Sequence, residues 1–215
     1  MKLLTFAVPC YNSEAYMEHC VQTLLEGGED VEIILVDDGS KDGTGAIADR
    51  YAEQYPSIVK VVHQENGGHG EGVNQGLRRA TGLYYKVVDS DDWADVDALK
   101  KVVEKLREFS QMEKPVDLLV CNYVYEHVED NTQKVMGYAN VFPRERVFTW
   151  EEIGRFRPSQ YLLMPSAGLR AGAAQAHLLC GQHLCLPAPP LCGDHLLYGP
   201  GLLPLLHRAG RPERQ

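Results

Sequence analysis

The sequence predicts an α/β fold in which a mostly parallel sheet is flanked by helices. Two observations support this fold class. Short apolar runs alternate with amphipathic segments along residues 3–121, as βαβ units require. A polar motif also follows each of the first four apolar runs, where parallel sheets carry their ligand-binding loops.

The first βαβ unit begins with the apolar run Leu3–Val8, which Pro9 ends. A helix is expected from Ser13 and Glu14 onward, because apolar residues then recur on one helical face. The run at residues 31–36 is rich in β-branched residues, as expected of a strand covered on both faces. The apolar face of the helix consists of Met17, Cys20, Val21, Leu24 and Leu25.

The later elements follow the same alternation. A second helix is expected to start at Asp42-Gly43-Thr44 and to end before Pro56. Strands are predicted at residues 59–63 and 83–88, and another strand begins at residues 118–121. Between the last two, Leu99, Val102, Val103 and Leu106 predict an amphipathic helix, and Asp130-Asn131 predicts a hairpin turn.

The motifs at the strand ends are polar and acidic. Because the carboxyl ends of parallel strands share one edge of the sheet, we expect all four loops to open there. Their five aspartates, without a basic partner, would repel one another and raise some pKa values unless a divalent cation bound nearby. The motifs are Pro9–Ser13, Asp37–Ser40, Gln64–Gly68 and Asp89–Asp92.

Asp89 and Asp91 form an Asp-x-Asp element whose carboxylates can converge on one ion. Hard oxygen ligands suit Mg²⁺ or Mn²⁺. Each motif taken alone also fits a solvated turn or a helix cap, and Gly67-Gly68-x-Gly70 fits a flexible connection. The evidence lies in four motifs, each at a strand end, in one order.

Composition narrows the class of protein. The net charge of −9 argues against a nucleic-acid partner. The chain lacks an apolar run of the roughly 20 residues that a transmembrane segment needs, and its first residues do not fit a signal peptide. We therefore expect a cytoplasmic protein, with the inner face of the membrane as an alternative, and free thiols.

In order, the four motifs resemble the successive signatures of family 2 glycosyltransferases over about residues 1 to 165. The resemblance implies the GT-A fold, which is a Rossmann-like sheet continuous with an acceptor-binding region. It also implies transfer of a sugar from a nucleotide-diphosphate donor, with UDP as the expected nucleotide. The acceptor would be the hydroxyl of a carbohydrate or a lipid-linked carbohydrate, as in polysaccharide biosynthesis.

The same resemblance assigns site residues. Asp38 would accept a hydrogen bond from the uracil ring, and Asp89 would lie by the ribose and the diphosphate. Asp91, with Asp89, would bind Mg²⁺ or Mn²⁺, which would neutralise the leaving nucleotide as a Lewis acid. The expected nucleotide-binding residues are Pro9, Tyr11, Asn12, Asp37, Asp38, Asn66 and Asp89.

Two features depart from the family pattern. Val73 stands where many relatives carry an arginine that meets the diphosphate, and His69 and Glu71 lie nearby; His69 would be a phosphate donor or a solvated loop residue. In inverting relatives an acidic residue beyond the central region acts as general base. After Gly168 the only acids are Asp194 and Glu213, so the catalytic residue is unknown and impaired transfer is expected.

The composition changes near Gly168, which predicts an incomplete sugar-nucleotide domain at residues 1–168 and an aberrant, disordered or irregular tail at residues 169–215. The tail lacks Lys, Ile, Val, Phe, Ser, Thr, Asn, Met and Trp altogether. A back-translation shifted by one nucleotide gives strand-like segments, one of which, Tyr-Val-Asp-Asn, resembles the place of the family's catalytic acid. We hypothesise a frameshift near codon 168, which also explains the zinc-like cluster of cysteines and histidines as a product of chance.

Two other functions remain open at this point. One is a non-catalytic remnant that binds nucleotide sugars, which the absence of an assigned base favours. The other is a sugar nucleotidyltransferase on a related sheet. Such enzymes hold a triphosphate in a Gly-rich basic loop, and Pro9–Asn12 contains neither glycine nor a basic residue.

Overall fold

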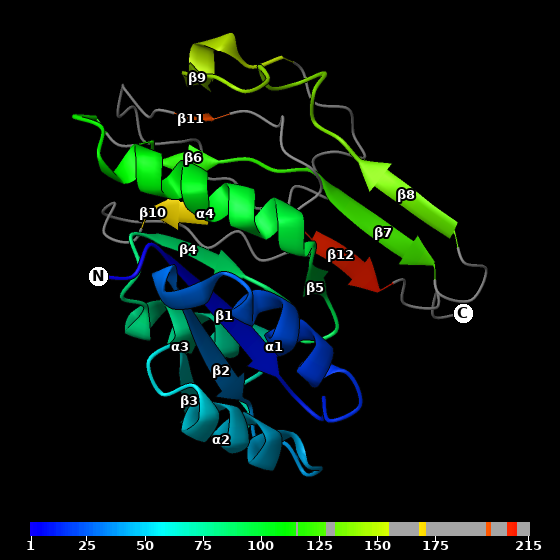
Figure 1. The fold of residues 1–215 in the computed structure, drawn as a ribbon. Coiled ribbons are helices and arrows are strands. Elements are labelled where there is room, and N and C mark those ends of the chain that lie inside the picture. Colours follow the sequence, from blue (N-terminus) through cyan, green and yellow to red (C-terminus); the bar gives the residue numbers. More distant parts are fainter. Residues whose placement is uncertain (115, 128–131, 155–167, 171–196, 199–205, 210–215) are drawn as a thin grey trace.

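The computed structural model describes residues 1–114, 116–127, 132–154, 168–170, 197–198 and 206–209 (Figure 1). Two 3-10 turns, η1 (Gly28–Asp30) and η2 (Trp150–Glu152), join longer elements. The α-helices of the described residues are α1 (Met17–Leu25), α2 (Thr44–Gln54), α3 (His69–Arg79) and α4 (Val96–Ser110). The strands of the main sheet are β1 (Leu4–Cys10), β2 (Val31–Asp37), β3 (Val59–His63), β4 (Tyr84–Val87), β6 (Leu118–Leu119), β9 (Val147–Phe148), β10 (Gly168–Arg170) and β11 (Leu197–Tyr198). A second sheet holds β5 (Trp93–Ala94), β7 (Tyr123–His127), β8 (Thr132–Met136) and β12 (Leu206–Ala209).

The main sheet has a topological switch point between β1 and β4. Within the described ranges its strand order is β3-β2-β1-β4-β10-β6-β11-β9. The first four strands run parallel to one another, and β10 pairs antiparallel with β4. The chain therefore builds outward from β1 to β3 and then returns to the other side of β1. Ligands of such sheets bind beyond the carboxyl ends of the strands at this reversal.

Helices cover both faces of the parallel strands, and the alternation of side chains in β1 and β2 explains why. Phe6 and Val8 belong to the large core cluster with the apolar face of α1. The intervening residues Ala7 and Pro9 face α3. All seven residues of β1 and all seven of β2 are buried as a result, as is usual for parallel strands with helices on both faces.

The described elements confirm the predicted fold class. The predicted strands match β1 to β4 to within two residues, and the second helix and that around Leu99 are α2 and α4. The first helix begins at Met17, after a turn at residues 13–16, and so later than expected. One helix, α3, was not predicted at all.

The far part of the chain is described in pieces. Strands β7 and β8 pair antiparallel as a hairpin, and the predicted turn at Asp130-Asn131 lies outside the described residues. Three strands include residues of the predicted tail: β10, which begins at Gly168, and β11 belong to the main sheet, and β12 belongs to the second sheet. The other residues of the tail lie outside the described part of the chain, so its predicted irregular character stays a prediction.

Candidate functional site

The loops after β1 and β4 meet at the switch point. The hydroxyl oxygens of Ser13 and Ser90 lie 2.8 Å apart. Both residues are buried, with 1% and 8% of their surface exposed. Because these two loops flank the reversal of strand order, this contact fixes the two sides of the predicted ligand-binding crevice relative to each other.

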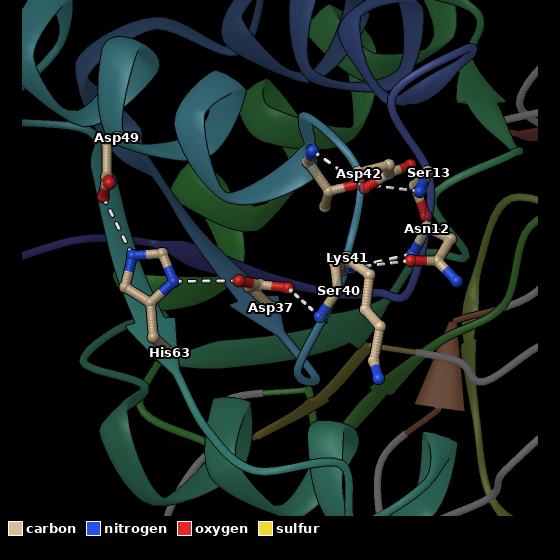
Figure 2. Close-up of polar contacts among 9 residues, drawn as sticks. Asn12, Ser13, Asp37, Ser40, Lys41, Asp42, Asp49 and His63 are labelled. Carbon is tan, nitrogen blue, oxygen red and sulfur yellow. Dashed lines mark hydrogen bonds and ion pairs between the residues drawn. The ribbon is translucent and has the colours of Figure 1, made fainter.

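The loop after β1 is also tied to the loop after β2. The backbone amide of Asn12 donates to Ser40 Oγ (3.1 Å), and the side-chain oxygen Oδ1 of Asn12 accepts a hydrogen bond from the backbone amide of Lys41 (2.9 Å), as Figure 2 shows. The Ser13 amide donates to Thr44 Oγ1 at 2.7 Å. Asn12 has a φ of 50°, in the left-handed region that asparagine tolerates better than most residues. These contacts hold that conformation in place.

Two neighbouring residues of the first motif have different surroundings. Tyr11 is 49% exposed, which leaves it accessible in the loop after β1. Pro9 is buried within β1, and a Cβ added at Gly72 of α3 would come within 3.1 Å of its ring. Pro9 therefore supports α3, and Tyr11 presents surface to a ligand.

Asp38 organises the third loop. Its Oδ1 accepts hydrogen bonds from Gln64 Nε2 (2.6 Å) and from the Gly67 amide (2.7 Å). Its Oδ2 accepts from the Gly68 amide at 2.8 Å. Asp38 is only 3% exposed. The carboxylate thus fixes the backbone that follows the exposed Asn66, so the second and third motifs form one structural unit.

Asp37 faces the opposite direction, toward β3. Its Oδ1 accepts from the Ser40 amide (3.0 Å), and its Oδ2 lies 2.9 Å from His63 Nδ1. Burial would raise the pKa of Asp37, but the hydrogen bonds from Ser40 and His63 hold it below its ordinary value. The hydrogen bonds to Asp37 and Asp49 raise the pKa of His63.

The acidic motif after β4 lies beside the N-terminus of α3. Asp89 Oδ1 is 2.9 Å from Nε2 of His69, the first residue of that helix. The expectation that the aspartates have no basic partner is therefore wrong for Asp37 and Asp89, each of which pairs with a histidine. In the same segment the Asp95 side chain caps α4 by accepting from the Ala98 amide.

Two thiols lie beneath these loops. Burial, with a contribution from Asp37, raises the pKa of Cys10 to about 12. Burial also raises the pKa of Cys20, and Cys10 and the aspartates of the fourth motif add to this effect. Burial therefore disfavours the thiolate form of both side chains. They are free cysteines, as expected.

The described carboxylates at this edge of the sheet do not form a closed set of metal ligands. Within the described ranges, no group of three or more His, Cys, Asp or Glu side chains is arranged to hold a metal ion. Mg²⁺ often takes only one or two protein carboxylates and completes its shell with phosphate and water. Asp89 and Asp91 fit that type of open site, because both follow β4 at the edge of the sheet.

Among the residues that the sequence singled out, Asn12, Asp37 and Asp38 are connected by hydrogen bonds between the first three loops. Ser13, Ser90 and His63 were not among them, although each makes a contact that joins two motifs or elements. The two serines lie inside the recognised motifs, so their position was available from the sequence. His63 ends a strand, and nothing in its neighbourhood along the chain marks it as a partner of Asp37.

Comparison with known proteins gives a family and a set of relatives. The family model for glycosyl transferase family 2 matches residues 5–170. Glycosyltransferase GlyG of Streptococcus pneumoniae serotype 4 is 36% identical over 133 residues, which are 60% of this chain and 42% of GlyG. Glycosyltransferase GlyA of the same organism is 30% identical over 163 residues, which are 71% of this chain and 23% of GlyA.

A similar solved structure is the crystal structure of S. aureus TarS 1-349 in complex with UDP. It superposes with a TM-score of 0.60 and 26% sequence identity, over 80% of this chain and 47% of that chain. The chain thus spans less than half the length of each of these three relatives. In the described part of the chain, no helix has the length and apolar character needed to cross a membrane.

Proposed function

The chain belongs to glycosyl transferase family 2, and from this premise we propose that it binds a UDP-sugar at the switch point of the main sheet. The acceptor would be the hydroxyl of a carbohydrate or lipid-linked carbohydrate. The TarS structure in complex with UDP supports uracil as the base, since 80% of this chain resembles part of that protein.

One observation carries the proposal: the four polar loops form one connected edge. Ser13 and Ser90 join the first and fourth loops, and Ser40 joins the second to the first through Asn12. Asp38 joins the second loop to the third. A rigid, connected edge of this kind is prepared to bind one extended ligand across all four loops.

The exposed residues of this edge would meet the nucleoside. We assign Tyr11 and Asn12 to the base and ribose, since Tyr11 is accessible and Asn12 is fixed by the second loop. Pro9 and Asp37 would not touch the nucleoside themselves: Pro9 packs against α3, and Asp37 contacts His63. Asp38 is buried and holds the third loop, and Asn66, which is exposed in that loop, would contact the nucleotide.

Asp89 and Asp91 would hold Mg²⁺ or Mn²⁺ against the diphosphate. The metal, when bound, would supply a Lewis acid that stabilises the departing diphosphate. Asp89 is already oriented by His69, so its carboxylate is held at the edge before a ligand arrives. An inverting transfer further needs a general base for the acceptor hydroxyl. We propose that residues 169–215 do not supply one and that transfer by this chain is impaired.

Calorimetric titration with UDP, with and without Mn²⁺, tests the donor site. We expect binding that strengthens with Mn²⁺ and that weakens by about 10-fold or more in Asp91→Asn, because the variant removes a charged metal ligand. Asp97→Asn is the matched control, since it makes the same change at an exposed position in the first turn of α4. It should bind UDP as the unchanged chain does.

A folded chain that fails to bind UDP under either condition would refute the donor site. If UDP affinity changes neither with Mn²⁺ nor in Asp91→Asn, the metal assignment is refuted and the nucleotide site still stands. Hydrolysis or transfer of a UDP-sugar, followed on the same preparation, then separates an enzyme from a chain that only binds the donor. We expect turnover far below that of family members with a complete acceptor region.

A further inference from the structure

His63 occupies a position between two carboxylates from different elements. Its Nδ1 lies 2.9 Å from Asp37 Oδ2 at the end of β2, and its Nε2 lies 3.0 Å from Asp49 Oδ1 on α2. The His63 side chain is 48% exposed, whereas that of Asp37 is only 11% exposed. The exposed ring therefore lies directly beside the largely buried carboxylate of Asp37, as Figure 2 shows.

The contact continues into the predicted nucleoside loop. Asp37 accepts a hydrogen bond from the Ser40 amide through its other oxygen, and Ser40 Oγ accepts one from the Asn12 amide. A series of contacts thus leads from Asp49 and His63 to Asn12 (Figure 2). Both oxygens of Asp37 take part in this series, so loss of the His63 contact would change how the carboxylate is oriented toward the Ser40 amide.

The backbone of α2 leaves room for this arrangement. A Cβ added at Gly45, in the first turn of the helix, would lie 3.0 Å from Asp37 Oδ2 and 3.5 Å from His63 Cε1. Glycine inside a helix destabilises it by about 0.5–1 kcal/mol relative to alanine. Its presence where α2 passes over the Asp37–His63 pair is explained by that close approach.

We propose that His63 is a positioning residue for the sugar-nucleotide donor, which holds Asp37, and through it Ser40 and Asn12, in the arrangement that binds the nucleoside. This inference rests on the proposed function. His63 acts only through other residues of the chain and makes no contact with the donor. Asp49 completes the arrangement by fixing the far side of the ring.

Protonation of the ring matters to this role. Only the imidazolium form donates from both nitrogens, and so only that form satisfies Asp37 and Asp49 together. These are the charged groups that face the ring, one from β2 and one from α2. If the protonated ring stabilises the binding arrangement, then nucleoside binding must by reciprocity favour protonation of His63.

The first experiment is UDP titration in the presence of Mn²⁺ with His63→Gln and Asp49→Asn. We expect UDP affinity to fall about 10-fold in His63→Gln, as for loss of a hydrogen bond to a charged group, and by less in Asp49→Asn. Arg50→Gln is the matched control, because Arg50 lies next to Asp49 on α2 but pairs with Glu18, away from the loops. Thermal melts of all variants check that they are folded.

The outcomes separate this inference from the proposed function. If the unchanged chain binds UDP and folded His63→Gln binds it equally well, then the positioning role is refuted and the donor site stands. If the unchanged chain does not bind UDP, both the donor site and the positioning role of His63 are refuted. A loss in Arg50→Gln as large as that in His63→Gln would also refute the role, since any weakening of α2 would then suffice.

The second experiment needs no variant of His63. Proton NMR follows the titration of the His63 ring with and without saturating uridine, which carries no phosphate charge that could itself attract a proton. We expect uridine to raise the midpoint of the His63 titration. A midpoint that does not move with uridine would overturn the inference, whether or not UDP binds.

Discussion

Ser13 and Ser90 share a hydrogen bond of 2.8 Å although they lie 77 residues apart along the chain. The bond joins loops on either side of the point where the strand order reverses. Ser13 Oγ also accepts from the Tyr11 amide at 3.2 Å. The Ser13 hydroxyl is therefore the common point of two contacts, and Ser90 contributes one of them.

Replacing these serines should destabilise the fold unequally. We expect Ser13→Ala to lower the free energy of unfolding by about 1–2 kcal/mol and Ser90→Ala by about 1 kcal/mol, because each leaves a buried polar group without its partner. Urea unfolding of both variants and the double variant gives their coupling energy. Ser57→Ala, which removes an exposed hydroxyl bonded to Glu29, should change little. Additive effects of the two replacements would contradict the shared bond.

Asp38→Asn should lower the stability of the fold by more than its small change in shape suggests. The carboxylate accepts from three donors, so an amide nitrogen in place of either oxygen would face an N–H group. We expect about 2–3 kcal/mol of lost stability and weaker UDP binding, since the third loop loses its anchor. Glu65→Gln, at an exposed position in that loop, is the control. Equal stability of the two variants would show that Asp38 does not anchor the loop.

The Asp37–His63 pair should give stability a defined pH dependence. The lowered pKa of Asp37 contributes stability above its unfolded pKa, and this is lost as pH falls through the folded value. The raised pKa of His63 contributes stability below about 6.5, and this is lost as pH rises through the folded value. The stability difference between the unchanged chain and His63→Gln should therefore be largest between about pH 4 and 6.5.

Urea unfolding at several pH values measures that difference. Because the ring is half exposed, we expect a modest effect of at most about 1 kcal/mol, and one that decreases in high salt. A difference that grows above neutral pH would contradict the assigned direction of the His63 shift.

Two glycines of α3 should respond to alanine in opposite ways. A Cβ at Gly76 would lie 2.4 Å from the Ala7 Cβ of β1, whereas one at Gly70 meets nothing within 4 Å. We expect Gly76→Ala to destabilise the chain by about 1–3 kcal/mol through overpacking. Gly70→Ala should stabilise it by about 0.5–1 kcal/mol through helix propensity. Similar melting temperatures for the two variants would contradict the packing of α3 on β1.

The same glycines explain why α3 was missed from the sequence. Segment His69–Arg79 contains glycine at three positions, and local propensity therefore predicts a loop. Two of the three, Gly72 and Gly76, let the helix approach Pro9 and Ala7 closely. Tertiary packing, which no local pattern records, therefore outweighs propensity here. The strands were predictable, because β1 and β2 are buried on both faces and read as continuous apolar runs.

The candidate site, too, was predictable from the sequence only in part. Motifs at strand ends could be placed on one edge from the sequence, because parallel pairing alone brings them there. The partners of each side chain could not. His63 reaches Asp37 across 26 residues, and Gly67 and Gly68 reach Asp38 across 29 and 30. Such contacts depend on how strands and loops lie in space, so the expected cluster of unpartnered aspartates was wrong for two of them.

The composition of residues 169–215 leads to the last prediction. If a frameshift near codon 168 produced this segment, sequencing the gene across that codon should reveal an inserted or deleted nucleotide. A chain with the frame restored should bind UDP about as well as the present one, because the four loops all precede Gly168. It should also transfer sugar far faster, because the restored segment would carry the acidic residue that serves as general base. An intact frame encoding Leu169–Gln215, or equal turnover of the two chains, would refute the frameshift as the cause of impaired transfer.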